Sequence, residues 1–197
     1  NPPITLTQLG SLVAGHGLQR DYVPLSAIHP NMRLAVVASE DQRFPTHNGF
    51  DWEQIEKAID YNEQHETKMR GGSTISQQVA KNVFLWQGRS YIRKGLEVYF
   101  TFMIELLYSK RRILELYLNV IETGKGVFGA EAAAQAYFKK PASKLSAREA
   151  AMIAASLPNP KRFTVKPVSK RVASRTPWVM RQMRFMTGSE GLDELLR

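Results

Sequence analysis

Helix-start signals recur along this chain, and they constrain its fold more than any other feature. Thr74 with Gln77, and Ser146 with Glu149, each form a capping box, in which two side chains satisfy free backbone groups at a helix start. Apolar residues at helical spacing follow both boxes, and no strand-like alternation runs for more than a few residues. The sequence therefore predicts a mostly α-helical protein.

Two further helix starts are expected from cap-forming residues. Asn31 is expected to cap a helix over residues 32–39. Thr176 followed by Pro177 predicts the start of the last long helix, because proline is well tolerated at the first helical position.

Composition limits the partners and the kind of site that the chain can form. It has 197 residues, enough for one domain with a real core, a formal net charge of +9 and no cysteine. The basic surplus favours polyanions such as nucleic acid, anionic lipid headgroups or phosphorylated substrates. The lack of cysteine excludes disulfide scaffolds and thiolate metal sites. No stretch reaches the roughly 18 apolar residues of a membrane span.

Glu40 is the leading candidate for a catalytic acid or base. It follows an apolar run over residues 34–38, and polar and aromatic residues come directly after it. Burial disfavours the charged form, so the pKa of such a carboxyl is expected to be raised, which suits proton transfer near neutral pH. The alternative is a carboxylate that only caps the helix or pairs with Arg43, and this stretch alone leaves both interpretations open.

Residues 71–82, GGSTISQQVAKN, form a candidate anion-binding turn. Two glycines allow close approach of the backbone, and the helix start at Thr74 presents free N–H groups. Thr74, Gln78 and Lys81 fall on one helical face; the alternative is an ordinary capped helix with a solvated lysine. The polar stretch over residues 62–70 predicts a linker or lid hinge, and we expect residues 62–72 to become ordered over bound substrate.

A basic segment and a strongly apolar helix follow. Residues 87–94 supply three cations: Arg89, Arg93 and Lys94. The helix up to residue 108 is expected to carry a narrow polar stripe among large apolar residues, at Lys94, Glu97, Thr101 and Glu105. Either this is a core helix whose stripe lines a cleft, or its apolar arc enters a membrane interface. We favour the core helix, because broad apolar faces usually pack inward.

One polar pair interrupts the apolar pattern over residues 110–121. Glu115 and Asn119 lie four residues apart, so their side chains are close enough to hydrogen-bond. Because buried polar groups usually pair locally, we interpret both residues as structural rather than catalytic.

Five longer motifs occur in order between residues 34 and 160. They are EDQRFPTHNGFD from residue 40, GGSTISQQVAKN from residue 71, RKGLE from residue 93, KRRILELYLNVIETGKGVFG from residue 110 and EAAMIAASLPNP from residue 149. Together they resemble the peptidoglycan glycosyltransferases of glycosyltransferase family fifty-one, and their length and order make the match far more specific than a lone motif. No transpeptidase-like segment follows, which resembles the monofunctional, membrane-anchored transglycosylases of Gram-negative bacteria, so we expect an enzyme of that type.

This resemblance implies a lysozyme-like, mostly helical fold with a larger head lobe and a smaller membrane-facing jaw lobe. We expect residues 1–197 to form a single glycosyltransferase domain, with an N-terminal membrane anchor removed. The expected location is the inner membrane, with the catalytic domain in the periplasm. The resemblance also favours the interfacial interpretation of the helix that ends near residue 108.

The resemblance further implies polymerisation of lipid II into glycan strands. The acceptor 4-hydroxyl would attack the anomeric carbon of a glycan carried on undecaprenyl pyrophosphate, with inversion. Glu40 matches the family's base, and Glu97 matches its second acidic residue. Further matched or neighbouring positions are expected to bind substrate: Asp41, Arg43, Phe44, His47, Ser73, Thr74, Gln77, Gln78, Lys81, Asn82, Arg89 and Arg93.

The expected partners follow from the same resemblance. They are lipid II, the undecaprenyl-pyrophosphoryl glycan, the membrane surface, phosphoglycolipid inhibitors such as moenomycin, and cell-division proteins. No cofactor is expected to be required, although a magnesium or manganese ion could bridge the substrate pyrophosphate. No protein metal site is visible in the sequence.

Two other functions compete with this one. A lysozyme-like hydrolase or lytic enzyme also uses a key glutamate in a helical fold, but it has no need for cations grouped around a pyrophosphate. A nucleic-acid binder would explain the +9 charge, yet the chain has no stacking-aromatic motif and no recognition-helix pattern. Neither therefore replaces the transglycosylase interpretation.

Overall fold

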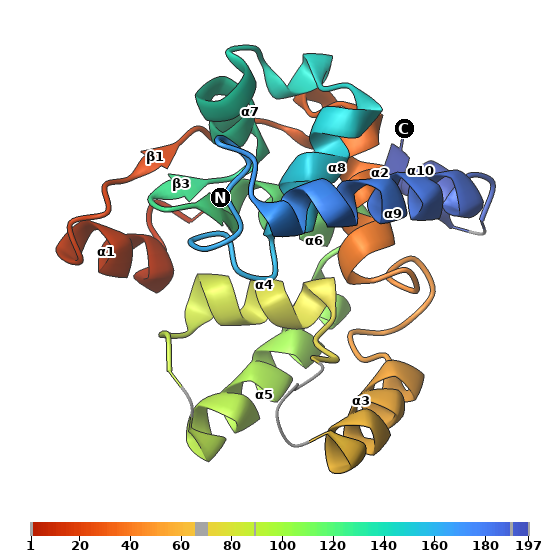
Figure 1. Ribbon diagram of the computed structural model, residues 1–197. Helices are drawn as coiled ribbons and strands as arrows, with labels where there is room; N and C mark the ends of the chain where they lie inside the picture. The colour runs from red at the N-terminus through yellow and green to blue at the C-terminus, as the bar shows by residue number, and fades with distance from the viewer. Residues whose placement is uncertain (1, 66–70, 89, 190, 197) are drawn as a thin grey trace.

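The computed structural model describes residues 2–65, 71–88, 90–189 and 191–196, and it is mostly helical (Figure 1). The predicted fold class is confirmed, and the helical content agrees with a lysozyme-like transglycosylase fold; the division into head and jaw lobes stays a prediction. The α-helices are α1 (Leu6–Val13), α2 (Pro30–Glu40), α3 (Trp52–Gln64), α4 (Ile75–Phe84), α5 (Tyr91–Leu107), α6 (Lys110–Val120), α7 (Ala130–Phe138), α8 (Ala147–Ser156), α9 (Lys170–Met186) and α10 (Leu192–Leu196). Two short 3-10 turns, η1 (Leu25–Ala27) and η2 (Ala142–Lys144), connect them.

A small sheet joins the chain before α2 to the turn after α6. Its strands are β1 (Gln19–Arg20), β2 (Glu122–Gly124) and β3 (Val127–Phe128), in the order β1-β3-β2. β3 pairs parallel with β1 and antiparallel with β2. Each strand has at most three residues, which explains why no alternating pattern is visible in the sequence.

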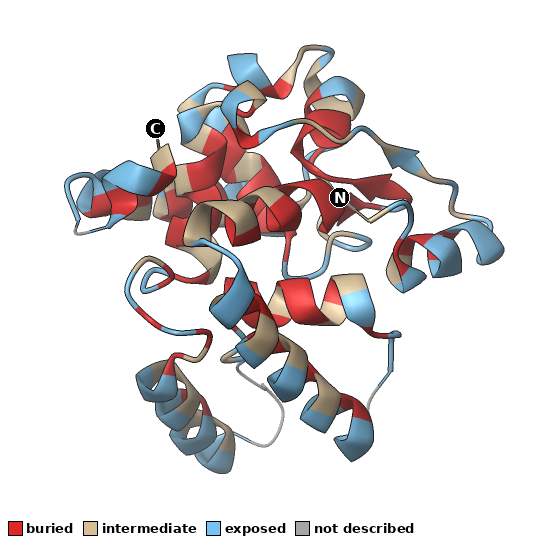
Figure 2. Cartoon of the chain, turned by 180° about the vertical axis from the view of Figure 1, so that it is seen from behind, coloured by how far each residue is buried: buried red, intermediate tan, exposed pale blue. Residues whose placement is uncertain are grey.

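The centre of the hydrophobic core is the packing of α2 against α8 and α9. Ala35, Val36 and Val37 of α2 are completely buried, and the alanine-rich face of α8 allows the helices to approach closely. Figure 2 shows this buried centre, with exposed surface concentrated on the peripheral helices. The core therefore holds the end of α2, where Glu40 lies, on a rigid element.

The predicted cap of α2 is wrong by two residues. His29 is the N-cap, and its Nδ1 accepts a hydrogen bond from the backbone N–H of Asn31 at 3.1 Å. Pro30 occupies the first helical position, where its missing N–H costs nothing. The side chain of Asn31 instead donates to the carbonyl oxygen of Leu145, which ties α2 to the start of α8.

The predicted start of the last long helix is also wrong. Ser169 caps α9, and Pro177 lies inside the helix rather than at its start. The buried face of α9 explains why the helix runs through the proline, because its apolar residues recur on one side from the first turn: Val172, Val179, Met183 and Met186. Burial of that face outweighs the hydrogen bond lost at Pro177.

The first residues of the predicted linker are helical. α3 continues through Gln64, with His65 at its C-cap, so residues 62–64 belong to the helix. Residues 66–70 lie outside the described part of the chain. The lid hypothesis therefore stays a prediction.

α5 is oriented opposite to a core helix: its apolar face points outward. Its polar stripe faces inward: Glu97 is 3% exposed and Thr101 is completely buried. Its apolar side chains face outward, with Phe102 59% and Leu106 67% exposed. Lys94 and Glu97 of the stripe line a cleft as expected, whereas Thr101 and Glu105 do not, and the prediction that the apolar arc packs into the core is wrong. Ile104 is the only apolar side chain of α5 that is buried, and Phe100 packs partly buried beside it.

Glu115 and Asn119 have the structural role predicted for them, but through other partners. Oε2 of Glu115 accepts from the backbone N–H of Leu25 at 2.8 Å. The side chain of Asn119 exchanges two hydrogen bonds with the backbone of Val23, both at 3.0 Å. These contacts attach the segment before α2 to α6.

Gly126 should be the glycine least tolerant of substitution. Its φ is +73°, and an added Cβ would lie 2.1 Å from the carbonyl oxygen of His16. We expect Gly126→Ala to destabilise the protein by more than the roughly 1–2 kcal/mol of a left-handed alanine, because a backbone clash is added. Gly95→Ala is the control: it lies in exposed helix with open space around it, and a gain of up to about 1 kcal/mol is expected. Thermal unfolding measures both, and equal melting temperatures for the two variants would contradict this account.

Candidate active site

A cavity of about 1620 Å³ opens beside the end of α2. Residues of α1, α2, α3, α4, α5 and α9 contribute to its wall, together with the segment that follows α8. Most of the predicted site residues line it: Glu40, Asp41, Arg43, Ser73, Thr74, Gln77, Gln78, Lys81, Asn82, Arg93 and Glu97. Arg89 lies outside the described residues, and Phe44 and His47 lie behind the wall.

Glu40 is the last residue of α2 and keeps a partly exposed position on the cavity wall. Burial of the carboxyl raises its pKa, and the charge of Asp41 raises it further. The hydrogen bond from Gln78 Nε2, at 3.1 Å, and the positive charge of Arg175 lower the pKa and so oppose burial. The result is a carboxyl that can release and accept a proton at a higher pH than an ordinary glutamate.

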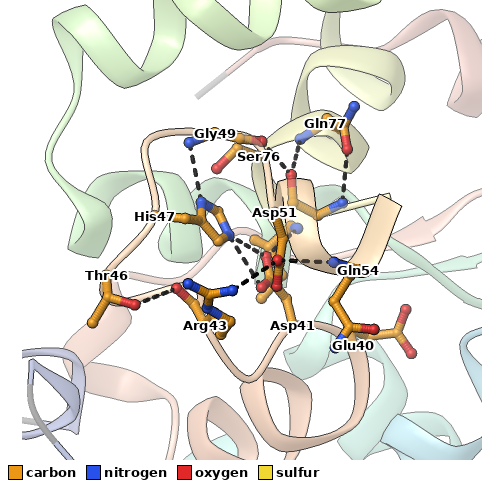
Figure 3. Close-up of polar contacts among 12 residues, drawn as sticks. Glu40, Asp41, Arg43, Thr46, His47, Gly49, Asp51, Gln54, Ser76 and Gln77 are labelled. Atoms are coloured by element: carbon orange, nitrogen blue, oxygen red, sulfur yellow. Dashed lines mark hydrogen bonds and ion pairs between the residues drawn. The ribbon is translucent and has the colours of Figure 1, made fainter. Parts of the chain in front are cut away.

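The alternative role for Glu40, a pair with Arg43, is wrong. The guanidinium of Arg43 bonds to Asp51 at 3.2 Å instead (Figure 3). It also bonds to Glu53 at 2.6 Å. Asp51 also caps α3, accepting from the N–H of Gln54 at 3.1 Å. Arg43 therefore lies at the rim of the cavity, with its charge directed toward α3.

Asp41 joins three segments of the site and is itself buried. Its Oδ2 accepts from His47 Nε2 and from the backbone N–H of Ile75, both at 2.9 Å. His47 Nδ1 accepts from the N–H of Gly49 at 3.0 Å, which fixes the hydrogen on Nε2, the nitrogen that faces Asp41 (Figure 3). Asp41 therefore holds the end of α2, the loop that follows it and the start of α4 together.

Phe44 and His47 are placed differently from the substrate-binding positions expected for them. Phe44 is completely buried in the core, beneath the Lys110 ammonium at 4.8 Å from the ring centre. The His47 ring is used by Asp41 and Gly49, and neither residue lines the cavity. Both therefore shape the loop after Glu40 from behind.

The start of α4 has the predicted capping box. Thr74 Oγ1 accepts from the N–H of Gln77, and Gln77 Oε1 accepts from the N–H of Thr74. The hydroxyl of Thr74 donates to the carbonyl of Gly49 at 2.7 Å, so the loop after Glu40 and the start of α4 are bonded together. The polar end of Gln77 is thus used within the cap, whereas Gln78 faces the cavity and Glu40.

A first set of cations lies on α4 and α5. Arg93 and Lys94 contact Glu97 at 2.8 Å and 2.6 Å. Lys81 has no ion-pair partner among the described residues; burial lowers its pKa, Glu97 opposes that effect, and Arg93 and Lys94 add to it. Arg93 Nε is also buried without a hydrogen-bond partner in the described chain. Positive charge is therefore held here in excess of its local compensation.

A second set of cations, on α9, is not predicted from the sequence. Arg171 and Arg175 line the cavity without an ion-pair partner among the residues described. Trp178, on the same face, supports the Arg175 guanidinium at 3.7 Å from its ring centre. The signal is present as an i, i+4, i+7 repeat, but placing the helix start at Thr176 removes the two arginines from the helix.

Chemically, the cavity offers a carboxyl with a raised pKa beside two groups of cations, of which Lys81, Arg171 and Arg175 have no ion-pair partner among the described residues. Such an arrangement can take a proton and stabilise anionic groups. Among the described residues, no group of three or more His, Asp or Glu side chains is placed to hold a metal ion, and no helix is long and apolar enough to cross a membrane.

Comparison with known proteins adds the family. The chain matches the family described as transglycosylase over residues 7–184. It is 55% identical over 190 residues to a biosynthetic peptidoglycan transglycosylase of Yersinia pseudotuberculosis serotype O:3 (strain YPIII), covering 95% of this chain and 79% of that protein. A protein of the same name from Yersinia pestis (strain Pestoides F) is 54% identical with the same coverage. Because both matches span nearly the whole chain, it belongs to the transglycosylase family, as a glycosyltransferase that builds peptidoglycan.

Proposed function

We propose that the chain polymerises lipid II by inverting transfer, with Glu40 as the general base. The donor is a glycan on undecaprenyl pyrophosphate, and the acceptor is the sugar 4-hydroxyl of lipid II. The observation that carries this proposal is the Glu40 carboxyl on the cavity wall, whose pKa is raised, opposite cations that include the unpaired Lys81, Arg171 and Arg175. Polymerisation of labelled lipid II, measured as glycan chain length, tests it directly.

In the proposed transfer, the oxygen of the acceptor hydroxyl attacks the anomeric carbon of the donor. Glu40 takes the proton of that hydroxyl at the same time. The bond from that carbon to the pyrophosphate oxygen breaks on the opposite face, so the configuration inverts. A raised pKa makes the ionised carboxylate a stronger proton acceptor than an ordinary glutamate.

The leaving pyrophosphate gains negative charge, which Lys81 and Arg93 are placed to stabilise. Both line the cavity, and neither has its full complement of partners in the described chain. Glu97 holds Arg93 and Lys94 by its two oxygens, so we assign it the role of orienting these cations. Positioned charges of this kind stabilise the transition state more than the ground state.

The acceptor lipid II also carries a pyrophosphate, and the α9 cations suit it. Arg171 and Arg175 lie on one helical face that lines the same cavity. We therefore infer that α4 and α5 hold the donor and α9 holds the acceptor. A magnesium or manganese ion would enter with a substrate pyrophosphate rather than at a site made by the protein.

We also propose that the protein works at the periplasmic surface of the inner membrane. α3 and α5 lie at the end of the molecule opposite α7 (Figure 1), and both expose large apolar side chains. The +9 net charge favours anionic headgroups. Phosphoglycolipids such as moenomycin suit the same combination of anion site and apolar face, and cell-division proteins remain expected partners.

A lytic enzyme is the second candidate, and the cations argue against it. Hydrolysis of mature glycan releases no pyrophosphate, so it gives no function to Lys81, Arg171 and Arg175. Turnover of lipid II but not of purified cell wall is the expected result, and the reverse would establish the lytic function.

Glu40→Gln should lose activity and gain stability at neutral pH. Loss of a general base costs roughly a hundred- to ten-thousand-fold in rate. Because folding raises the pKa of Glu40, the native protein loses stability as pH rises through that pKa, and a neutral amide avoids the loss. The melting temperature of Glu40→Gln should exceed that of the parent at pH 8, and this advantage should disappear below the ordinary glutamate pKa of 4.5.

Glu56→Gln is the matched control for this change, because it removes a carboxylate on the exposed face of α3. It should leave both the polymerisation rate and the pH dependence of melting close to those of the parent. Near-normal polymerisation by Glu40→Gln would rule out its role as base.

Lys81→Ala should weaken both donor binding and turnover. Removing one positioned donor to developing charge costs about a hundred- to a thousand-fold in rate. Lys57→Ala is the control: it removes an exposed lysine that pairs with Glu53 on α3. It should change neither donor binding nor turnover. Binding of a lipid pyrophosphate analogue and polymerisation are measured for both variants. If the analogue binds Lys81→Ala as tightly as the parent, Lys81 does not hold the pyrophosphate.

Phe102→Asp should reduce binding to anionic vesicles. Phe102 projects from the apolar face of α5 and is 59% exposed, so its replacement places a charge where we expect lipid. Phe185 of α9 is 73% exposed, so Phe185→Asp tests whether losing any exposed phenylalanine reduces vesicle binding. Co-sedimentation should fall several-fold only for Phe102→Asp. Equal binding by both variants and the parent would remove α5 from the membrane contact.

A further inference from the structure

Tyr117 of α6 is connected to the active-site carboxylate through one other side chain. Its hydroxyl donates to Oε1 of Gln78 at 3.1 Å, and Nε2 of Gln78 donates to Oε2 of Glu40 at 3.1 Å. Two hydrogen bonds therefore run from α6 through α4 to the end of α2. Within the described part of the chain, Gln78 is the only hydrogen-bond partner of this hydroxyl.

Tyr117 cannot itself touch a substrate. It is completely buried and is not among the residues that line the cavity, whereas Gln78 and Glu40 both are. Any effect of its hydroxyl on the reaction must therefore pass through Gln78.

The direction of the two hydrogen bonds is set by the phenol. Burial raises the pKa of Tyr117 well above its usual value, and the charges of Glu40 and Asp41 add to that effect. The phenol therefore keeps its single proton throughout the range in which a carboxyl titrates, and it remains a donor. With that proton on its oxygen, the Gln78 amide must turn its NH₂ group toward Glu40.

The opposite amide orientation would be unfavourable. It would bring the amide oxygen against the Glu40 carboxylate, so that two acceptors face each other without a proton between them. In that orientation the Tyr117 hydroxyl would accept a hydrogen bond from Gln78, and its own buried proton would have no acceptor. An unsatisfied buried donor costs free energy, which disfavours that state further.

We propose that Tyr117 is a positioning residue for glycosyl transfer, because it locks the Gln78 amide with an N–H directed at Glu40. This inference rests on the proposed role of Glu40 as base. An N–H donor stabilises the ionised carboxylate and so opposes the effect of burial. Tyr117 thereby helps to keep Glu40 ionised and aligned when the acceptor hydroxyl arrives.

Several other groups act on Glu40, and the test must separate them. Ser39 and Asp41 lie on or beside its own helix, Gln78 comes from α4 and Arg175 from α9. α8 also packs against α2 but contributes none of these groups. Tyr117→Phe leaves all of them in place and removes one oxygen atom.

The primary test is a carbon-13 NMR titration of protein labelled at the glutamate side-chain carboxyl, without substrate. The Glu40 signal is identified by its absence from Glu40→Gln. In Tyr117→Phe the Glu40 midpoint should rise by roughly one pH unit, about a tenfold change in its ionisation equilibrium. Tyr137→Phe is the control, because it removes a hydroxyl bonded to the Thr123 carbonyl at the same 3.1 Å, away from Gln78. It should leave the Glu40 midpoint unchanged.

A second variant shows whether Tyr117 acts through Gln78. Gln78→Met removes the amide and should raise the Glu40 midpoint at least as much as Tyr117→Phe does. The double variant should titrate like Gln78→Met alone, because no amide remains to be positioned. An unchanged midpoint in Tyr117→Phe, or fully additive shifts, overturns the proposal. An unchanged midpoint in Gln78→Met overturns it even if Tyr117→Phe fails to fold.

The titration is independent of the assigned reaction. If the parent does not polymerise lipid II, the proposed function fails while the effect of Tyr117 on Glu40 is still measured. If it does, the acid limb of the polymerisation rate should move to higher pH in Tyr117→Phe by the same amount as the NMR midpoint. A uniform loss of rate with no movement of that limb would indicate a merely structural role and contradict the proposal.

Discussion

The buried carboxylate of Asp41 is the contact on which the rest of the site depends. It accepts hydrogen bonds from His47 and from the N–H of Ile75, and so joins the end of α2, the following loop and the start of α4. Removing it would leave buried donors unsatisfied, at about 1–3 kcal/mol for each. Glu40 precedes Asp41 in the chain, and Gln78 lies one turn into α4. The contacts of Asp41 therefore set the spacing between Glu40 and its donor.

The cavity holds more positive charge than its acidic residues compensate. Glu97 compensates Arg93 and Lys94, whereas Lys81, Arg171 and Arg175 lack ion-pair partners in the described chain. Unpaired charges in a partly buried wall are costly, since burial disfavours the charged form of both Lys81 and Arg175. An anionic ligand would reduce that cost, because its binding supplies the negative charge that the unpaired cations lack.

The sequence was sufficient for the helical class, for the capping box at Thr74 and for most of the residues around Glu40, because caps and motifs are local signals. It failed where packing decides the outcome. The buried face of α9 carries the helix through Pro177 and so brings Arg175 to the cavity. Phe44 and His47 lie within a matched motif, yet they face the core, and a motif does not say which side of a wall its residues occupy. The contact from Tyr117 to Gln78 joins residues 39 positions apart, which no periodicity reveals.

The rotation of α5 about its own axis decides both which side chains line the cavity and which face the outside. Its charged stripe forms part of the cavity wall, and its apolar face points away from the protein. An α-helix turns by about 100° for each residue, so one residue inserted before Arg93 would rotate both faces together. Glu97 would leave the cavity as the apolar arc swung toward it. The helical register of α5, rather than its composition alone, therefore keeps the charged chemistry inside and the apolar surface outside.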